Sequence, residues 1–159
     1  MLVPIDIPTA SYAVASAPDT LTTVSIGSCV AICLYSSSAS VGALMHCMLP
    51  RAEQHMTNPY LYTDTALSSI TKELIERGVT VQELTAKIVG GAQMFPTLHT
   101  EGQDIGKRNI DEAKLLLKVI GIPIVASDVG GNNGRSLVFD LTTGGVTITQ
   151  ALSAEVKQI

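Results

Sequence analysis

The chain has 159 residues, a size at which one hydrophobic core is usual, so we expect a single domain over residues 1–159. Hydrophobic residues make up 46% of the chain, which excludes a disordered class of protein. The formal net charge is −4 and the ten Lys and Arg residues are scattered. The sequence therefore lacks the basic stripe with which nucleic-acid-binding proteins neutralise phosphates.

Cysteine usage and the first residues indicate a cellular compartment. The N-terminal residues lack a basic region followed by an uninterrupted apolar stretch, which an export signal would need. No apolar run approaches the roughly 20 residues that span a bilayer. Three cysteines, an odd number, are typical of reduced thiols. We therefore expect a cytoplasmic protein.

The first third of the chain predicts strands. Residues 1–20 contain three prolines and predict loop-like backbone with one short strand at residues 12–15. Residues 21–26 predict a second strand, which the turn pair Gly27-Ser28 ends. Two short apolar runs, residues 29–35 and 41–49, flank a polar turn and predict a hairpin.

The rest of the chain predicts two helices among further strands. The first helix covers residues 63–77, with Thr63 or Asp64 as its N-cap and Gly78 at its end. Its apolar face consists of Leu67, Ile70, Leu74 and Ile75. We expect Asn109 to cap the second helix and Gly121 to end it, with Ile110, Ala113, Leu116, Leu117 and Ile120 facing the core. Strands are expected at residues 84–89, 122–127, 136–140 and 146–149. This pattern predicts an α+β fold, a layered sandwich of mostly antiparallel strands with two main helices.

Cys29 is the candidate nucleophile. It follows Gly27-Ser28, a tight turn that exposes a thiol and leaves backbone N–H groups free to bind an oxyanion. A cysteine beside an apolar run is also a common small core residue, and Cys29 alone does not distinguish the two. If the hairpin turns near Ser38, the residue opposite Cys29 lies close to position 47, which brings His46 within possible reach. A slip of one residue would turn His46 to the other face.

A pair of Cys29 and His46 has clear chemical value. An adjacent imidazole lowers the pKa of a thiol and can later protonate a leaving amine. A third group must hold the imidazole in the right tautomer, and the hydroxyl of Thr23 on the preceding strand could do so. A threonine is also at home in any strand, so this role stays an expectation.

Other residues suggest alternative roles, namely a metal site, a phosphate-binding loop or a partner surface, which the sequence supports less well. Cys29, Cys33, Cys47 and His46 are zinc ligands by type, but on strands they would not converge on one point. Cys33 and Cys47 are better explained as core or flanking thiols, and His55 and His99 as exposed loop residues. The glycine-rich segments at residues 90–95 and 130–134 match no phosphate-binding motif. Met94 and Phe95 could form an adaptable partner surface or pack in the core.

Several separated motifs resemble one protein family. They are residues 26–30 (Ile-Gly-Ser-Cys-Val), 41–50, 86–95, Asn109 after residues 105–108, and 128–131. In this order and spacing they resemble the CheD family of chemoreceptor glutamine deamidases, over about residues 12–146. The chain departs from the family pattern at Ser25, where a glycine is usual, and at Cys47, where a valine is common. A second thiol beside the site could make it sensitive to oxidation.

The resemblance implies a fold, an activity and partners. The fold would be an α+β sandwich similar to that of the cytotoxic necrotizing factor toxins. The activity would be deamidation of glutamines on the cytoplasmic helical bundle of methyl-accepting chemotaxis receptors, without a cofactor. Cys29 would match the nucleophile, His46 the general base and Thr23 the residue that orients the histidine. A CheC-type phosphatase would be a partner that docks near the site. The residues expected to bind substrate or partner are Gly27, Ser28, Gly90, Gly91, Ala92, Met94 and Phe95.

Two rival functions stay open on the sequence. The chain could be a non-catalytic binding module that regulates a CheC-type phosphatase, or a cysteine hydrolase with another amide substrate. Alkylation of cysteines at different pH values would separate the first from an enzyme, and free glutamine tested against a receptor helix would separate the second.

Overall fold

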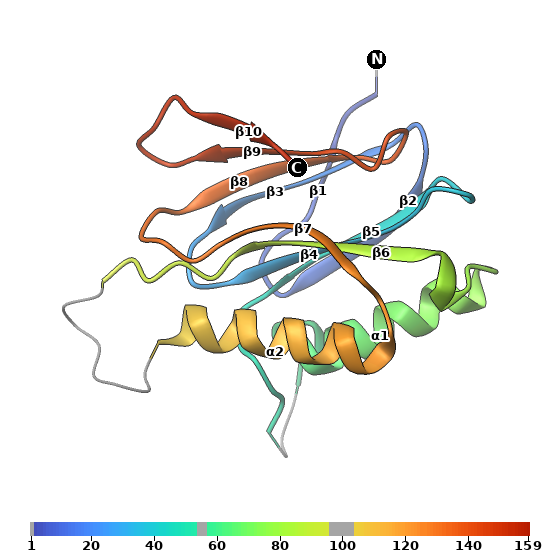
Figure 1. The fold of residues 1–159 in the computed structure, drawn as a ribbon, viewed down its shortest axis with the longest axis horizontal. Coiled ribbons are helices and arrows are strands. Elements are labelled where there is room, and N and C mark those ends of the chain that lie inside the picture. Colours follow the sequence, from blue (N-terminus) through green and yellow to red (C-terminus); the bar gives the residue numbers. More distant parts are fainter. Residues whose placement is uncertain (1, 54–56, 96–103) are drawn as a thin grey trace.

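A computed structural model describes residues 2–53, 57–95 and 104–159, which form two β-sheets and a layer of helices (Figure 1). One sheet has the strand order β1-β3-β8-β9-β10 and the other β2-β5-β4-β6-β7. Neighbouring strands are antiparallel except for the parallel pairs β1–β3 and β6–β7. The bounds are β1 Ile5–Asp6, β2 Ser11–Ser16, β3 Thr20–Ile26, β4 Val30–Ser36, β5 Val41–Cys47, β6 Leu84–Gly90, β7 Ile124–Val129, β8 Arg135–Asp140, β9 Val146–Gln150 and β10 Val156–Gln158. This arrangement confirms the predicted α+β sandwich.

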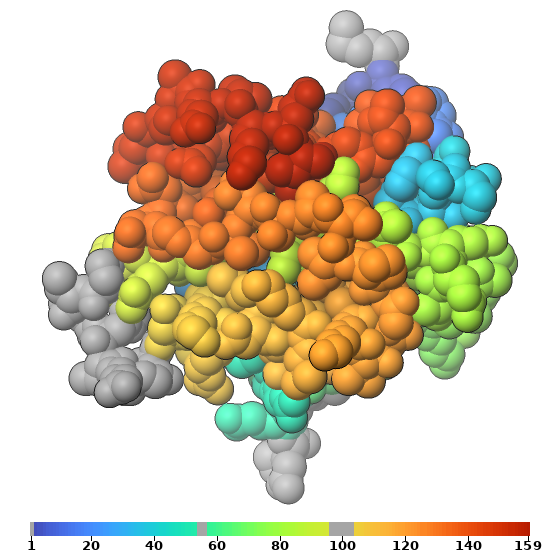
Figure 2. Space-filling model, in the orientation of Figure 1, coloured from blue at the N-terminus to red at the C-terminus, as the bar shows by residue number. Residues whose placement is uncertain are grey.

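Two helices, α1 Thr63–Glu76 and α2 Ile105–Ile120, cover the outer face of the β2-β5-β4-β6-β7 sheet (Figure 1). Short 3-10 helices, Pro59–Leu61 and Val81–Glu83, precede α1 and β6. In the space-filling view, α2 covers the lower front of the molecule and the last two strands lie above it (Figure 2). Neither helix is both long enough and apolar enough to cross a membrane.

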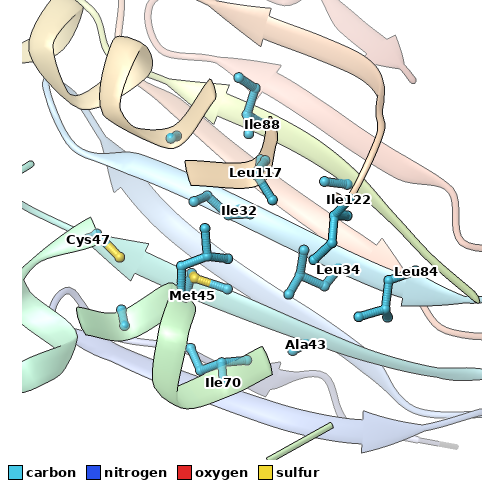
Figure 3. Packing of buried hydrophobic residues seen from close by; sticks show 14 of the residues in the cluster. Ile32, Leu34, Ala43, Met45, Cys47, Ile70, Leu84, Ile88, Leu117 and Ile122 are labelled. Atoms are coloured by element: carbon cyan, nitrogen blue, oxygen red, sulfur yellow. The ribbon is translucent and has the colours of Figure 1, made fainter. Parts of the chain in front are cut away.

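The main hydrophobic core lies between the helices and the central strands. Alternate residues of β4 and β5 point toward the helices because successive side chains of a strand face opposite ways. They meet the apolar stripes of α1 and α2, spaced three and four residues apart. Figure 3 shows this packing, which includes Ile32, Leu34, Met45, Cys47, Ile70, Leu84, Ile88, Leu117 and Ile122. All of them are buried, so this face of the sheet serves stability.

A second core fills the space between the two sheets. Its apolar members include Ala31 and Cys33 from β4, Leu44 from β5 and Phe139 from β8. Two polar residues of the facing strands, Thr23 on β3 and His46 on β5, are also completely buried. Buried polar groups need partners, so this layer is where chemistry is to be sought.

The hairpin of β4 and β5 is confirmed, with a register that differs by one residue from the predicted one. Ser36 pairs with Val41, so four residues form the connection and Val30 lies opposite Cys47. Ser40 closes the turn with a left-handed backbone, at φ 52°. Serine rarely adopts this conformation, and the sequence therefore gives little sign of the extra residue. Extended by one residue, the same register sets Cys29 opposite Met48.

Several predictions of local structure were wrong. Asn109 does not cap α2, because the helix begins at Ile105 and Asp104 is the N-cap, accepting a hydrogen bond from the backbone of Lys107. The N-cap of α1 is Tyr62 rather than Thr63 or Asp64. Ile75 is exposed and does not belong to the buried face of α1. The short strands β1 and β10 were not predicted, since two or three residues carry too little pattern.

Candidate active site

Cys29 stands in the turn between β3 and β4, where the chain crosses from one sheet to the other. It is partly exposed, and Ser28 before it is exposed. Its side chain packs against the core between the sheets, which includes Ala31 two residues further on. The thiol is therefore at the border of the inter-sheet layer and within reach of solvent.

His46 lies on β5 directly opposite Ala31 and faces the other sheet. Cys29 and Ala31 are two residues apart and border the same layer, so the observed register sets His46 on the side of the hairpin that carries Cys29. A register shifted by one residue would turn the imidazole toward the helices. Alanine opposite the histidine leaves room for the ring.

A hydrogen bond between the two sheets holds the imidazole. Thr23 Oγ1 lies 2.8 Å from His46 Nδ1 and donates to the carbonyl oxygen of Ile7 at 2.6 Å. A hydroxyl has one proton, which goes to the carbonyl because a carbonyl only accepts. Nδ1 must then carry the proton that the hydroxyl accepts, and Nε2 holds a free lone pair. The geometry fixes the tautomer in which Nε2 can act as a base.

Nε2 is buried and has no hydrogen-bond partner among the described residues. An unpaired buried acceptor is costly, so a hydrogen bond to Nε2 from a nucleophile or a substrate would be favourable. Burial lowers the pKa of His46 to about 4, so the ring is neutral at physiological pH. The imidazole is therefore present as a base and not as an imidazolium.

The expected lowering of the pKa of Cys29 by the histidine is not found. Burial raises the pKa of the Cys29 thiol, and a hydrogen bond from its own backbone N–H offsets this only in part. Both side chains are then neutral at rest, in contrast to a preformed thiolate–imidazolium pair. A reaction through this pair must transfer the proton as the nucleophile attacks.

The segment after β6 holds the nucleophile turn through its backbone. The N–H of Gly91 donates to the carbonyl of Cys29 at 2.7 Å, and that of Ala92 to the carbonyl of Gly27 at 2.9 Å. A Cβ on Gly90 would lie 2.4 Å from the carbonyl oxygen of Cys29. Gly90, Gly91 and Ala92 are buried, so they support the turn from within, and of the three only Ala92 borders a cavity beside it. This differs from the contact role expected for them.

Met94 and Phe95 are the exposed large side chains of this loop, Phe95 with 61% of its surface accessible. The sulfur of Met94 lies over Gly27, where a Cβ would come within 2.7 Å of it. A cavity of about 180 Å³ adjoins Ser28 and is bordered by Met94 and Phe95. Its remaining lining residues are Ala92, Gln93, Asp104, Ile105 and Gly106. An apolar side chain or a glutamine could enter it beside the turn.

A larger hollow of about 630 Å³ borders the N-terminal half of α2. Its lining includes Arg51, Arg108 and Glu112, with Arg51 and Glu112 paired at 2.8 Å. The residues that line it do not include Cys29 or His46. Size alone thus does not mark the reactive site.

The remaining cysteines and histidines do not extend the site. Cys33 and Cys47 are fully buried, and burial raises the pKa of each to about 12. Within the three described ranges, no three His, Cys, Asp or Glu side chains converge as metal ligands would. His55 and His99 lie outside the described residues.

Asn109 is a further residue of the site, which the sequence analysis identified only as a helix cap and as part of a family motif. Fully buried in α2, it donates from Nδ2 to the carbonyl oxygens of Ser28 at 2.9 Å and Met48 at 3.0 Å. The available sign was an asparagine on the apolar face of an amphipathic helix, beside Ile110 and Ala113. Because asparagine is favoured at N-caps, the sequence suggested a helix start instead.

Comparison with known proteins identifies the family. Residues 48–150 match the family model described as CheD chemotactic sensory transduction. The chain belongs to the CheD family. The chemoreceptor glutamine deamidase CheD of Thermotoga maritima is 39% identical over 148 residues, 93% of this chain and 92% of that protein. A Pyrococcus abyssi protein, named as a probable chemoreceptor glutamine deamidase CheD, is 41% identical over 91% of this chain and 90% of its own length.

The two kinds of match cover different parts of the site. The CheD family model begins at Met48 and does not reach Thr23, Cys29 or His46. An alignment over more than nine-tenths of the chain necessarily extends across those three residues. The alignments with CheD proteins therefore cover the turn that carries Cys29, the candidate nucleophile, as well as both helices.

Proposed function

We propose that this CheD protein deamidates specific glutamines on the cytoplasmic helical bundle of methyl-accepting chemotaxis receptors, and that it does so in the cytoplasm. Relatives that align with nearly the whole chain are named chemoreceptor glutamine deamidases. The observation that carries the proposal is the hydrogen bond between Thr23 and His46, which leaves Nε2 without a partner, on a strand position whose register sets His46 on the side of the hairpin that carries Cys29. A binding module would have no need of such a buried base.

The reaction begins with the neutral pair. Cys29 gives its proton to His46 Nε2 while its sulfur forms a bond to the side-chain carbonyl carbon of glutamine. The carbonyl oxygen becomes an oxyanion, which the backbone N–H groups of the turn at residues 27–29 stabilise. Losing one such donor typically costs about 10²–10³ in rate. His46 then protonates the amide nitrogen, the carbon–nitrogen bond breaks and ammonia leaves.

Hydrolysis of the thioester completes the cycle. His46 Nε2, again a free base, takes a proton from water as the water oxygen attacks the thioester carbon. The carbon–sulfur bond breaks, the proton returns to the sulfur of Cys29, and the product is glutamate. Thr23 is a positioning residue throughout, since its hydroxyl holds the proton-bearing Nδ1 and keeps the ring from turning.

Docking of a receptor helix or a CheC-type phosphatase would use the exposed side chains around the turn. Met48, Met94 and Phe95 are exposed there beside Ser28. Methionine and phenylalanine adapt to helical partners with apolar contacts. The deamidation turns a neutral receptor side chain into an acidic one.

Peptide mass spectrometry of a receptor cytoplasmic fragment tests the proposal. The fragment is incubated with the native protein, with Cys29→Ala, or alone. We expect glutamine-to-glutamate conversion at a few sites with the native protein only, and no conversion of free glutamine. Binding of the fragment without conversion would contradict the enzymatic function and support a regulatory binding module. Conversion of free glutamine would indicate a different amide substrate.

A further inference from the structure

Asn109 is unusual for its position. It is the fifth residue of a 16-residue helix and completely buried, whereas asparagine is a poor helix former. Its Nδ2 uses both protons on backbone carbonyls, and its Oδ1 is buried without a partner among the described residues. An unsatisfied buried acceptor costs about 1–3 kcal/mol. A leucine there would avoid this cost, so helix packing alone does not explain the amide.

The two carbonyls belong to the two strands of the site. Ser28 is the residue before the nucleophile, and Met48 follows the end of the strand that carries His46. One side chain therefore bridges the open ends of β4 and β5, where the hairpin's own pairing stops at Val30 and Cys47. Among the described hydrogen bonds, Asn109 Nδ2 is the one donor that the carbonyls of Ser28 and Met48 share.

The bond to Ser28 orients the next N–H group. A trans peptide is planar, and its C=O and N–H point in opposite directions. The carbonyl of the Ser28–Cys29 peptide points toward α2, so the N–H of Cys29 points away from the helix. A hydrogen bond from the Cys29 backbone also acts to lower the pKa of its thiol, against the larger effect of burial. A rotation of this peptide would remove the donor from the thiolate and from an oxyanion formed on the neighbouring carbon.

We propose that Asn109 is a positioning residue, which holds the Ser28–Cys29 peptide in the orientation that serves the thiolate and the oxyanion and fixes this turn against the His46 strand. The kinetic part of this inference rests on the proposed deamidase function. The part that concerns the thiol does not depend on a substrate.

The same helix face supports the turn from a second side. Gly106, three residues before Asn109, lies against backbone, since a Cβ there would come within 2.5 Å of the carbonyl oxygen of Gly91 and 2.6 Å of that of Ala92. Those two residues donate hydrogen bonds to the carbonyls of Cys29 and Gly27. Residues three apart share a helix face. The first turns of α2 thus clamp the nucleophile turn directly and through the segment after β6.

The test compares Asn109→Leu and Asn109→Gln with the native protein. Leucine keeps the branched shape and the number of side-chain heavy atoms and favours the helix but donates no hydrogen bond, while glutamine keeps the amide. Iodoacetamide alkylation of Cys29 is followed against pH, and kcat and KM are measured on a receptor fragment. For Asn109→Leu we expect an alkylation midpoint at higher pH and a fall in kcat of about tenfold or more, with KM within about threefold. For Asn109→Gln we expect an alkylation midpoint and a kcat between those of Asn109→Leu and the native protein.

Thr71→Ala is the matched control. Thr71 is a buried polar residue of α1 whose hydroxyl donates to Leu67 of its own helix at 2.7 Å, so its loss destabilises without touching the turn. Its alkylation profile should equal that of the native protein. A native profile and native kcat in folded Asn109→Leu would overturn the inference, and so would failure of both Asn109 variants to fold. If the native protein converts no receptor glutamine, the proposed function fails and the alkylation profiles alone decide the role of Asn109.

Discussion

The two faces of the β4–β5 hairpin differ in kind although they are built from alternate residues of the same strands. The face toward the helices is mainly apolar, with Val30, Ile32, Leu34, Ala43, Met45 and Cys47, and has the buried Ser36 at the turn end of β4. The face toward the other sheet has Ala31, Cys33 and Leu44, and in addition the buried His46. Neighbouring residues of one strand therefore lie in different layers, one in the stabilising core and the next beside a buried base.

The difference shows how a small fold accommodates a buried titratable group. The helix-facing layer excludes water and supplies apolar burial at roughly 25 cal/mol per Å². The inter-sheet layer carries the cost of desolvating the imidazole, which Thr23 reduces by accepting the proton on Nδ1. At the open end of the hairpin, the partly exposed Cys29 borders this layer.

The largest effect should separate the cysteines of the two faces. Cys29→Ala should reduce receptor deamidation by about 10⁴-fold or more, since a nucleophile is removed. Cys47→Ala, on the helix-facing layer, should retain activity and lower the free energy of unfolding by about 1–2 kcal/mol. Peptide mass spectrometry and urea unfolding measure the two quantities. A Cys47 variant that is folded but inactive would contradict the division between the faces.

Gly90→Ala should disrupt the support of the nucleophile turn. Its φ is 113°, and the new Cβ would meet the carbonyl oxygen of Cys29. We expect a loss of about 2–5 kcal/mol in unfolding free energy from strain and overpacking together, and reduced deamidation in the folded fraction. Gly121→Ala is the control, because φ is 94° there but no atom lies within 4 Å. Gly121→Ala should lower the unfolding free energy by about 1 kcal/mol and leave deamidation unchanged. Equal losses of stability and activity in the two variants would contradict the supporting role of Gly90.

Acid should destabilise the protein through the inter-sheet face. His46 has a pKa of about 4 when folded, against an ordinary 6.5, so the unfolded chain binds the proton more readily. The stability of the folded protein that depends on a neutral His46 is fully present above pH 6.5 and is lost as the pH falls toward 4. The loss amounts to roughly 3 kcal/mol. Urea unfolding at several pH values measures it, and His46→Gln should flatten the dependence in this window. An unchanged slope in that variant would refute the assignment.

Removing the hydroxyl on Thr23 should weaken catalysis without changing the nucleophile. Thr23→Val keeps the shape but takes away the acceptor that fixes the tautomer of His46. We expect kcat to fall by about 10²-fold, within the range of general-base catalysis. Thr22→Val is the matched control, since Thr22 is the neighbouring residue on β3 and bonds to the carbonyl of Leu137 instead. Equal kcat values for the two variants would show that the tautomer is not limiting.

Much of the fold could be predicted because its signals are local. Turn pairs, a polar turn between apolar runs and the spacing of apolar residues indicated the hairpin and both helices. The register was predicted only to within about a residue, because the turn ends in Ser40, and a serine gives no sign of the left-handed backbone that a glycine would suggest. That single residue decides which face His46 occupies.

The site could be predicted only in part, since its support is tertiary. A turn motif and a hairpin made a pair of Cys29 and His46 possible, and the resemblance to CheD proteins implied their roles, which stay predictions. The role of Asn109 could not be predicted, because its amide bonds to residues that lie 81 and 61 positions away in the sequence. The raised pKa of Cys29 depends on burial by the opposite sheet, which no local pattern expresses.

The most direct test of the central claim is alkylation of the native protein with iodoacetamide, with peptide mapping of the label and measurement of the remaining receptor deamidation. Cys33 and Cys47 are fully buried, so label should appear on Cys29 alone. Activity should fall in proportion to the labelled fraction, with a rate that rises above pH 8.5 as expected for a raised thiol pKa. Protein fully labelled on Cys29 that still converts receptor glutamines would contradict the account.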